Sequence, residues 1–160
     1  MENKSIEQQI VELLLQKHYT ITCAESCTGG LLCSKLVNVS GASEVLKSSV
    51  VTYAEEAKIR FLGVKRETLS EFGVVSEQTA REMAEGALGL AEADVSLSVT
   101  GIAGPGGGSE EKPVGLVYIG CNVRGFITVK RYVFGGDRLQ VREQSVNAAL
   151  ELAKECILKD

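Results

Sequence analysis

Short β-rich runs alternate with stretches of helical spacing through the first two thirds of the chain. The strand-like runs cover residues 20–23, 48–53 and 95–99. The stretches whose apolar residues recur at helical spacing cover residues 6–17, 31–39, 54–62 and 77–91. Glycines at 41, 63 and 73 follow helical stretches or short turns, as expected where a helix ends. Residues 67–72 are predicted to form only a short turn.

The last third has a different order of elements. Residues 114–121 and 126–134 read as two strands joined by a short segment that contains a glycine, which predicts a β-hairpin. Asp137, with Gln140 three residues later, is predicted to open a final helix. Alternating strands and helices followed by a hairpin predict an α/β sandwich with a mixed sheet, mainly parallel, that ends in an antiparallel hairpin.

One serine stands where a predicted strand breaks into a helix. Residues 24–30, with the sequence AESCTGG, are too small and polar to continue the strand, and a helical stretch starts at Leu31. Such a turn presents a side chain at the carboxyl end of a sheet and leaves N–H groups of the new helix free for a docked group. Ser26 is therefore the first candidate nucleophile.

A serine nucleophile needs a general base, because a free hydroxyl is too weakly acidic at neutral pH. The single histidine, His18, ends the first predicted helix with no motif around it. Tyr53 and Lys58 lie at the end of the second predicted strand and in the helix that follows, so both could face one pocket. A serine–lysine or serine–tyrosine–lysine hydrolase is then coherent. The alternative for Lys58 is an ordinary solvated helix lysine.

A glycine-rich loop at residues 101–113 directly follows the strand at 95–99. Open α/β sheets bind ligands at this edge, and glycines let backbone N–H groups approach an anion closely. The loop lacks the Gly-Lys-Ser/Thr ending of a P-loop and the Gly-x-Gly-x-x-Gly-helix pattern of a dinucleotide site. It is predicted to contact substrate, and the alternative is a flexible surface connection.

Two arginines lie one turn apart on the last predicted helix, Arg138 and Arg142. Arg138 falls in the first turn, where a positive charge opposes the helix dipole. This mild misfit indicates an anionic partner such as a substrate phosphate. The alternative is a salt bridge with Glu143 or another acid.

Composition narrows the choice of function. The net charge of −4 argues against nucleic-acid binding, and no apolar run is long enough to span a bilayer. With 160 residues and no signal-peptide pattern, we expect one cytoplasmic domain over residues 1–160. Five cysteines without a Cys-x-x-Cys pair, and a single histidine, do not predict a metal site. The cysteines are predicted to be small buried hydrophobes, although a thiol nucleophile at Cys27 is an alternative.

Taken together, several segments resemble the C-terminal domain of CinA-type proteins, the nicotinamide-nucleotide amidase family. The resemblance runs from about Ile6 to Cys156. It rests on residues 22–30 (TCAESCTGG), 51–53 (VTY) with Lys58, 73–76 (GVVS), 100–105 (TGIAGP), 108–115 (GSEEKPVG) and 136–138 (GDR).

The resemblance implies a three-layer α/β/α domain, often a homodimer, that needs neither metal nor cofactor. It implies hydrolysis of the carboxamide of nicotinamide mononucleotide to nicotinate mononucleotide and ammonia. The family's serine, tyrosine and lysine fall on Ser26, Tyr53 and Lys58. The expected substrate-binding residues are Thr28, Gly29, Gly30, Thr100, Gly101, Gly104, Arg138 and Arg142.

Two alternative functions remain open, and the chain differs from many family members in one respect. A catalytically weak nucleotide-binding regulatory module would use the glycine-rich loop and Arg138 but need neither Ser26 nor Lys58. A redox protein would use Cys23 and Cys27. Many members of the family carry a large N-terminal domain related to molybdopterin-binding proteins, and this chain begins at the amidase domain. We therefore expect it to lack the pyrophosphatase activities that belong to the other domain.

Overall fold

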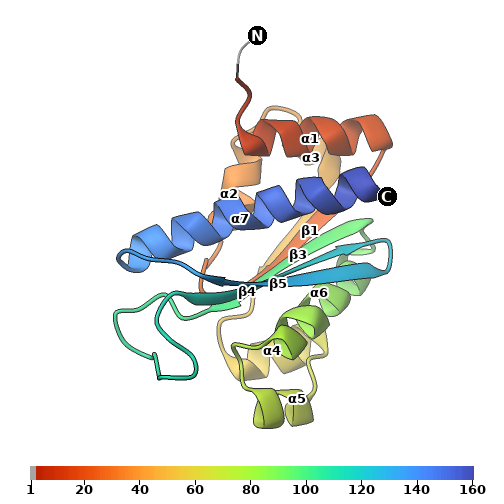
Figure 1. The fold of residues 1–160 in the computed structure, drawn as a ribbon. Helices are drawn as coiled ribbons and strands as arrows, with labels where there is room; N and C mark the ends of the chain where they lie inside the picture. Colours follow the sequence, from red (N-terminus) through yellow and green to blue (C-terminus); the bar gives the residue numbers. More distant parts are fainter. Residues whose placement is uncertain (1–2) are drawn as a thin grey trace.

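A five-stranded mixed sheet with helices on both faces forms the framework of the chain (Figure 1). The computed structural model describes residues 3–160. The strands run in the order β2-β1-β3-β4-β5, with β1, β2 and β3 parallel and with β4 and β5 antiparallel to their neighbours. Their bounds are β1 Ile21–Glu25, β2 Leu46–Val51, β3 Val95–Gly101, β4 Leu116–Val123 and β5 Phe126–Val133. This arrangement confirms the predicted fold class.

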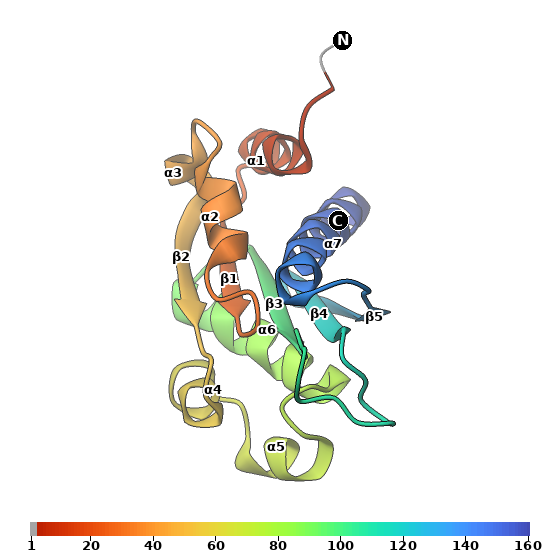
Figure 2. The ribbon, with the colours of Figure 1, turned by 90° about the vertical axis from the view of Figure 1, so that its left-hand side faces the viewer.

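The helices form a layer on each side of the sheet (Figure 2). On one side lie α1 (Ile6–Lys17), α2 (Leu31–Val37) and α7 (Arg138–Lys159), with the short α3 (Ala42–Val45) beside α1 and α2. On the other side lie α4 (Glu55–Leu62), α5 (Arg66–Phe72) and α6 (Glu77–Ala91). The larger hydrophobic core lies under α1, α2 and α7, and a smaller one joins Ala24 to α4, α5 and α6.

Several boundaries differ from the prediction, and strand pairing explains the main ones. β1 continues to Glu25 although residues 24–25 looked too polar, because β2 and β3 pair with it on both sides up to that residue. β3 likewise continues to Gly101, which pairs with Val117 of β4. β2 ends at Val51, so Tyr53 lies beyond the strand. Residues 66–72 form helix α5 rather than a turn.

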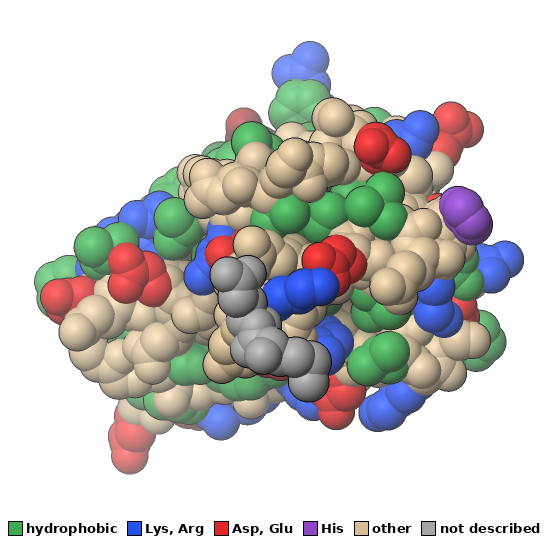
Figure 3. Space-filling view, turned by 90° about the horizontal axis from the view of Figure 1, so that it is seen from above, with side chains coloured by type: hydrophobic (Ala, Val, Ile, Leu, Met, Phe, Trp, Pro, Cys, Tyr) green, Lys and Arg blue, Asp and Glu red, His purple; other side chains and the backbone are tan. Residues whose placement is uncertain are grey.

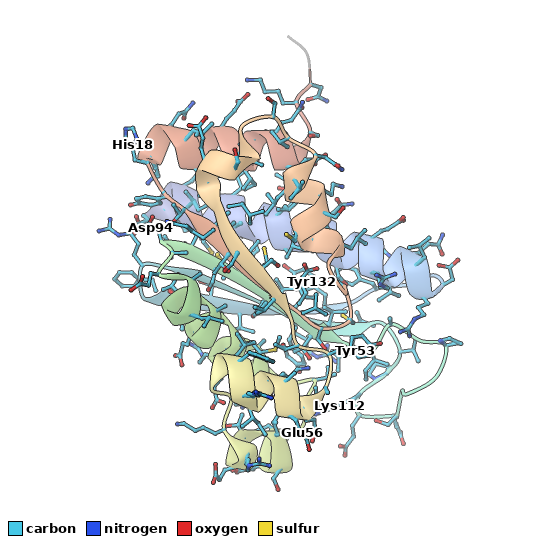
Figure 4. The ribbon with its side chains drawn as sticks, turned by 180° about the vertical axis from the view of Figure 1, so that it is seen from behind. His18, Tyr53, Glu56, Asp94, Lys112 and Tyr132 are labelled. Atoms are coloured by element: carbon cyan, nitrogen blue, oxygen red, sulfur yellow. The ribbon has the colours of Figure 1, made fainter. Side chains whose placement is uncertain are left out.

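The three parallel strands bring distant segments to one edge of the sheet. Glu25 at the end of β1 pairs with Val51 of β2 on one side and Val99 of β3 on the other. The turn after β1, the segment after β2 and the glycine-rich loop after β3 therefore leave the sheet together. Figure 4 shows His18 and Asp94 at the opposite end of the molecule from Tyr53. None of the helices within residues 3–160 has the length and apolar character needed to cross a membrane.

Candidate active site

Ser26 and Lys58 meet at the carboxyl edge of the sheet. Ser26 is the first residue after β1, and Lys58 reaches it from α4, which follows β2. The Nζ of Lys58 lies 3.0 Å from the Oγ of Ser26, and both side chains are buried. Two residues that are 32 positions apart in the sequence thus form one hydrogen-bonded pair.

The surroundings of Lys58 make its amine easier to deprotonate. The side chain is fully enclosed, with 0% of its surface exposed, and burial lowers its pKa from 10.5 to about 8. Its Nζ donates to the carbonyl oxygens of Thr52 (2.6 Å) and Tyr53 (3.3 Å). Because two N–H groups are held by these carbonyls, the lone pair of the neutral amine is directed at Ser26. Lys58 is therefore not the solvated helix lysine of the alternative interpretation.

The carbonyl oxygen and the side-chain hydroxyl of Tyr53 make different contacts. Its carbonyl oxygen accepts from Lys58, whereas its hydroxyl lies 3.0 Å from Nη2 of Arg138 on α7. The ring is largely exposed, at 61%. The structure therefore brings Lys58 directly to Ser26 and turns the Tyr53 hydroxyl toward Arg138 at the mouth of the site.

Arg138 connects the last helix to the glycine-rich loop. It is exposed, and its Nη1 donates to the carbonyl oxygen of Gly104 at 2.7 Å. Asp137 caps the start of α7 with a capping box that includes Gln140, as predicted. No acidic side chain among residues 3–160 pairs with Arg138, in contrast to the alternative of a salt bridge.

Arg142 is committed to the turn that carries Ser26. Its Nε donates to the carbonyl oxygen of Cys27 and its Nη2 to that of Thr28, both at 2.9 Å. Since its guanidinium is already occupied by backbone carbonyls, Arg138 is the better placed of the two arginines for an incoming anion. Arg142 instead fixes the direction in which the peptide groups of the turn point.

Glu25 holds the same turn from its other side. Its carboxylate is completely buried, and its two oxygens accept hydrogen bonds from the N–H groups of Leu32 (2.9 Å) and Cys33 (3.1 Å) in the first turn of α2. A carboxylate at a helix N-terminus is favoured by the helix dipole, which compensates for part of the loss of hydration. The end of β1 is thereby tied to the start of α2 across the turn at residues 26–30.

The three turn residues expected to bind substrate have distinct contacts. Gly29 donates its N–H to the carbonyl oxygen of Ser26 at 3.1 Å. The N–H groups of Thr28 and Gly30 donate to no acceptor among residues 3–160. The hydroxyl of the fully buried Thr28 also lacks a partner within that range. Gly29 and Gly30 have φ values of +57° and +102°, which an L side chain rarely adopts, so the turn depends on glycine at these positions.

The residues expected in the loop after β3 lie at the same edge with different exposures. Thr100 is buried, and its hydroxyl donates to the carbonyl oxygen of Val74. Gly101 ends β3, where a Cβ would come within 2.6 Å of Val117. Gly104 touches the site through its carbonyl oxygen, which Arg138 holds. Thr100 and Gly104 are therefore both buried at this edge, and Gly101 is partly buried.

The thiol and metal alternatives receive little support from the geometry. Burial raises the pKa of Cys27 to about 11 and that of Cys23 well above its usual value, so neither is a ready thiolate. His18 is exposed at the surface (Figure 3), and the whole of β1 separates it from Ser26. Within residues 3–160, His, Cys, Asp and Glu side chains do not gather in groups of three that could hold a metal ion.

Comparison with known proteins identifies the family. Residues 3–157 match the family described as the CinA C-terminal domain. The chain belongs to this family. A CinA-like protein of Kosmotoga olearia is 51% identical over 97% of the chain, and a protein of Caldicellulosiruptor saccharolyticus named for competence-damage induction is 47% identical over 99%. The chain spans 38% of the length of these curated relatives.

Solved structures of CinA superfamily proteins share the fold throughout. A protein from Klebsiella pneumoniae superimposes with a TM-score of 0.94 at 35% identity, over 97% of each chain. One from Escherichia coli gives a TM-score of 0.90 at 34% identity, over 96% of this chain and 88% of its own. These names refer to competence or damage and to the superfamily, and they specify no chemical reaction.

Glu25 is the residue of this CinA domain that the sequence interpretation missed. It stands directly before Ser26 in the AESCTGG segment, and a carboxylate between an apolar strand and a serine was the available signal in the sequence. In the structure, β2 and β3 pair with β1 up to this residue. The sequence gave no sign that Arg142 binds backbone carbonyls of the turn, because a hydrogen bond to a carbonyl 114 residues away leaves no local pattern.

Proposed function

We propose that this CinA domain is a nicotinamide-nucleotide amidase, which hydrolyses the carboxamide of nicotinamide mononucleotide to nicotinate mononucleotide and ammonia. The observation that carries the reaction type is the buried Ser26–Lys58 pair, with 3.0 Å between Oγ and Nζ and a lysine pKa of about 8. A weakly basic, desolvated lysine beside a serine is a nucleophile with its base. The choice of substrate comes from the sequence resemblance.

In the proposed mechanism, Ser26 attacks the carboxamide carbon while neutral Lys58 takes the hydroxyl proton. The N–H groups of Thr28 and Gly30 are the available donors for the oxyanion, and such a donor is typically worth about 3–4 kcal/mol in the transition state. Lys58 then gives the proton to the amino group of the tetrahedral intermediate, the C–N bond breaks, and ammonia leaves. Water, activated by the same amine, hydrolyses the acyl-enzyme and restores Ser26.

The opposite side of the edge would hold the rest of the nucleotide. Arg138 is exposed and has no carboxylate partner among residues 3–160, so it is the proposed phosphate ligand, with Gly104 and the Tyr53 hydroxyl beside it. Thr100 and Gly101, at the end of β3, are the proposed substrate contacts beside this subsite. No metal or cofactor takes part in any proposed step, and the protein is proposed to act as a homodimer in the cytoplasm.

The test is ammonia release from nicotinamide mononucleotide by the wild-type chain and three variants. Ser26→Ala and Lys58→Met are expected to lose at least a thousandfold in turnover, whereas Cys27→Ala should retain most of it. Nucleotide binding, measured by calorimetry, should survive in Ser26→Ala. Near-normal release from Ser26→Ala would refute the nucleophile assignment, and binding without turnover in the wild type would support the regulatory module instead.

A further inference from the structure

Two cysteines from different elements meet at the end of the molecule that the proposed reaction does not use. Cys121 lies in β4, where it pairs directly opposite Thr128 of β5, so the two side chains share the sheet face that α7 covers. Cys156 projects from the C-terminal half of α7 and packs against the same core. Cys121 is fully buried and Cys156 is half-buried. Cys156 and Thr128 line the same cavity, and Thr128 is the strand partner of Cys121, so the two cysteines lie near each other.

Cys156 opens into a cavity between the β4–β5 hairpin and the end of α7. The cavity has a volume of about 430 Å³, with apolar walls from Val123, Phe126 and Leu152. The site around Ser26 does not overlap it, because Cys156 follows Arg142 by about 20 Å along α7. A small reagent can therefore reach Cys156 without entering the candidate active site, while Cys121 lies behind it in the core.

The titratable groups around Cys156 come from its own helix, α7, and from strands β4 and β5, which α7 covers. Glu155 and Lys159 lie on α7, Lys130 and Tyr132 on β5, and Cys121 on β4. Glu155 is held by Lys130 at 2.6 Å and lies 3.8 Å from Lys159, so its negative charge is largely compensated.

The two thiols differ in acidity. Interaction with the Cys121 thiol lowers the pKa of Cys156 to about 6, against the opposing effect of burial. The same interaction, together with burial, raises the pKa of Cys121 well above its usual value. Cys156 is therefore the more acidic of the two thiols. This is the arrangement in which a thiolate attacks an oxidant and a second thiol resolves the product.

We propose that Cys156 is a hydroperoxide-reactive modification site of this domain and that Cys121 is its resolving thiol. The Cys156 thiolate attacks one oxygen of hydrogen peroxide, the O–O bond breaks, and the products are the sulfenic acid of Cys156 and hydroxide, which takes up a proton from solvent. The Cys121 sulfur then attacks the sulfenic sulfur, and the hydroxyl leaves as water with the Cys121 proton. Overall, two thiols are oxidised to a disulfide between β4 and α7 and one peroxide is reduced to two waters.

The experiment treats the reduced wild-type chain with one equivalent of hydrogen peroxide and maps its cysteines by mass spectrometry under non-reducing conditions. The expected product is an intramolecular Cys121–Cys156 disulfide. In Cys121→Ser, Cys156 should stop at a sulfenic acid that dimedone traps, whereas Cys33→Ser is the matched control and should form the disulfide like the wild type. A disulfide between other cysteines, or oxidation confined to Cys33, would overturn the proposal.

A second measurement needs no variant and is independent of the amidase proposal. Limited alkylation of the wild-type chain with iodoacetamide at about pH 6.5 should label Cys156 at least tenfold faster than Cys33, which is also half-buried. Equal labelling of the two, or slower labelling of Cys156, would contradict the assignment even if a variant failed to fold.

Discussion

Lys58 shows how a single buried residue defines the candidate chemistry. Its amine is removed from water, held by two carbonyl oxygens and aimed at Ser26. Burial disfavours the ammonium form, and the resulting pKa of about 8 lies close to the pH at which a general base is most effective. Glu25 and Arg142 act on the other member of the pair, since they tie the turn of Ser26 to α2 and to α7.

The pH dependence of turnover follows from the neutral form of Lys58. We expect kcat/KM for ammonia release to rise with pH by about tenfold per unit below pH 8 and to level off above it, because only the deprotonated amine can accept the Ser26 proton. Lys58→Arg should be inactive at every pH, since a guanidinium remains charged. A wild-type profile that is flat between about pH 6 and pH 9 would exclude Lys58 as the base.

Glu25→Ala tests whether the turn must be held from the β1 side. The change leaves the N–H groups of Leu32 and Cys33 without their acceptors, so we expect the free energy of unfolding to fall by about 1–3 kcal/mol. Turnover should fall more than tenfold, because the Ser26 hydroxyl is no longer fixed against Lys58. The matched control is Val95→Ala, which destabilises the buried amino end of β3. If both variants lose equal turnover, Glu25 serves stability alone.

At the scale of elements, the position of α4 decides whether Lys58 reaches Ser26. α4 packs on α6, and the contact is closest at Gly86, where a Cβ would come within 1.8 Å of the carbonyl oxygen of Leu62 at the end of α4. A glycine at that point lets the two helices approach. α7 has the corresponding role on the other face, since it carries Arg138 to the loop and Arg142 to the turn.

Two glycines of the same helix provide a paired test. Gly86→Ala should lower the free energy of unfolding by about 1–3 kcal/mol and reduce turnover, because α4 and Lys58 must shift to admit the methyl group. Gly89→Ala meets nothing within 4 Å and should instead stabilise the protein by about 0.5–1 kcal/mol with turnover unchanged. Thermal or urea unfolding checks both values. A neutral Gly86→Ala would mean that α4 is not held by this contact.

At the scale of the whole molecule, the site joins two parts of the chain that are far apart in the sequence. The parallel strands and their helices supply Ser26 and Lys58, and the antiparallel part with α7 supplies Arg138. β1 and β3 lie in the middle of the sheet, and nearly all their residues are buried. β2 and β5 are the edges, and their side chains are more exposed.

Hydrogen exchange should reflect this order of burial. The amides of β1 and β3 are expected to exchange slowest, at the rate of global unfolding, and those of β5 and β2 faster by local opening. Mass spectrometry or NMR at a fixed pH measures the rates. Exchange in β5 as slow as in β3 would contradict the prediction for an isolated chain and would indicate that a second copy covers this edge, as the proposed homodimer would allow.

Local pattern alone sufficed for most of the fold. The capping residue Asp137, the glycine at 63 and the hairpin between β4 and β5 are short-range signals, and the elements beside them formed as predicted. The misjudged elements depend on distant partners. β1 extends to Glu25 because strands from two other parts of the chain pair with it, and α5 forms where local composition suggested a turn.

The sequence by itself determined the alternation of elements and the choice of candidate residues for the site, because periodicity, caps and side-chain chemistry are properties of neighbouring positions. Only the tertiary structure decided how those residues combine. It brought Lys58 to 3.0 Å from Ser26, turned the Tyr53 hydroxyl toward Arg138, and set Glu25 and Arg142 to hold the turn. The physical reason is that burial, pKa and hydrogen-bond geometry depend on which distant segments pack together, and the parallel strands bring those segments to one edge.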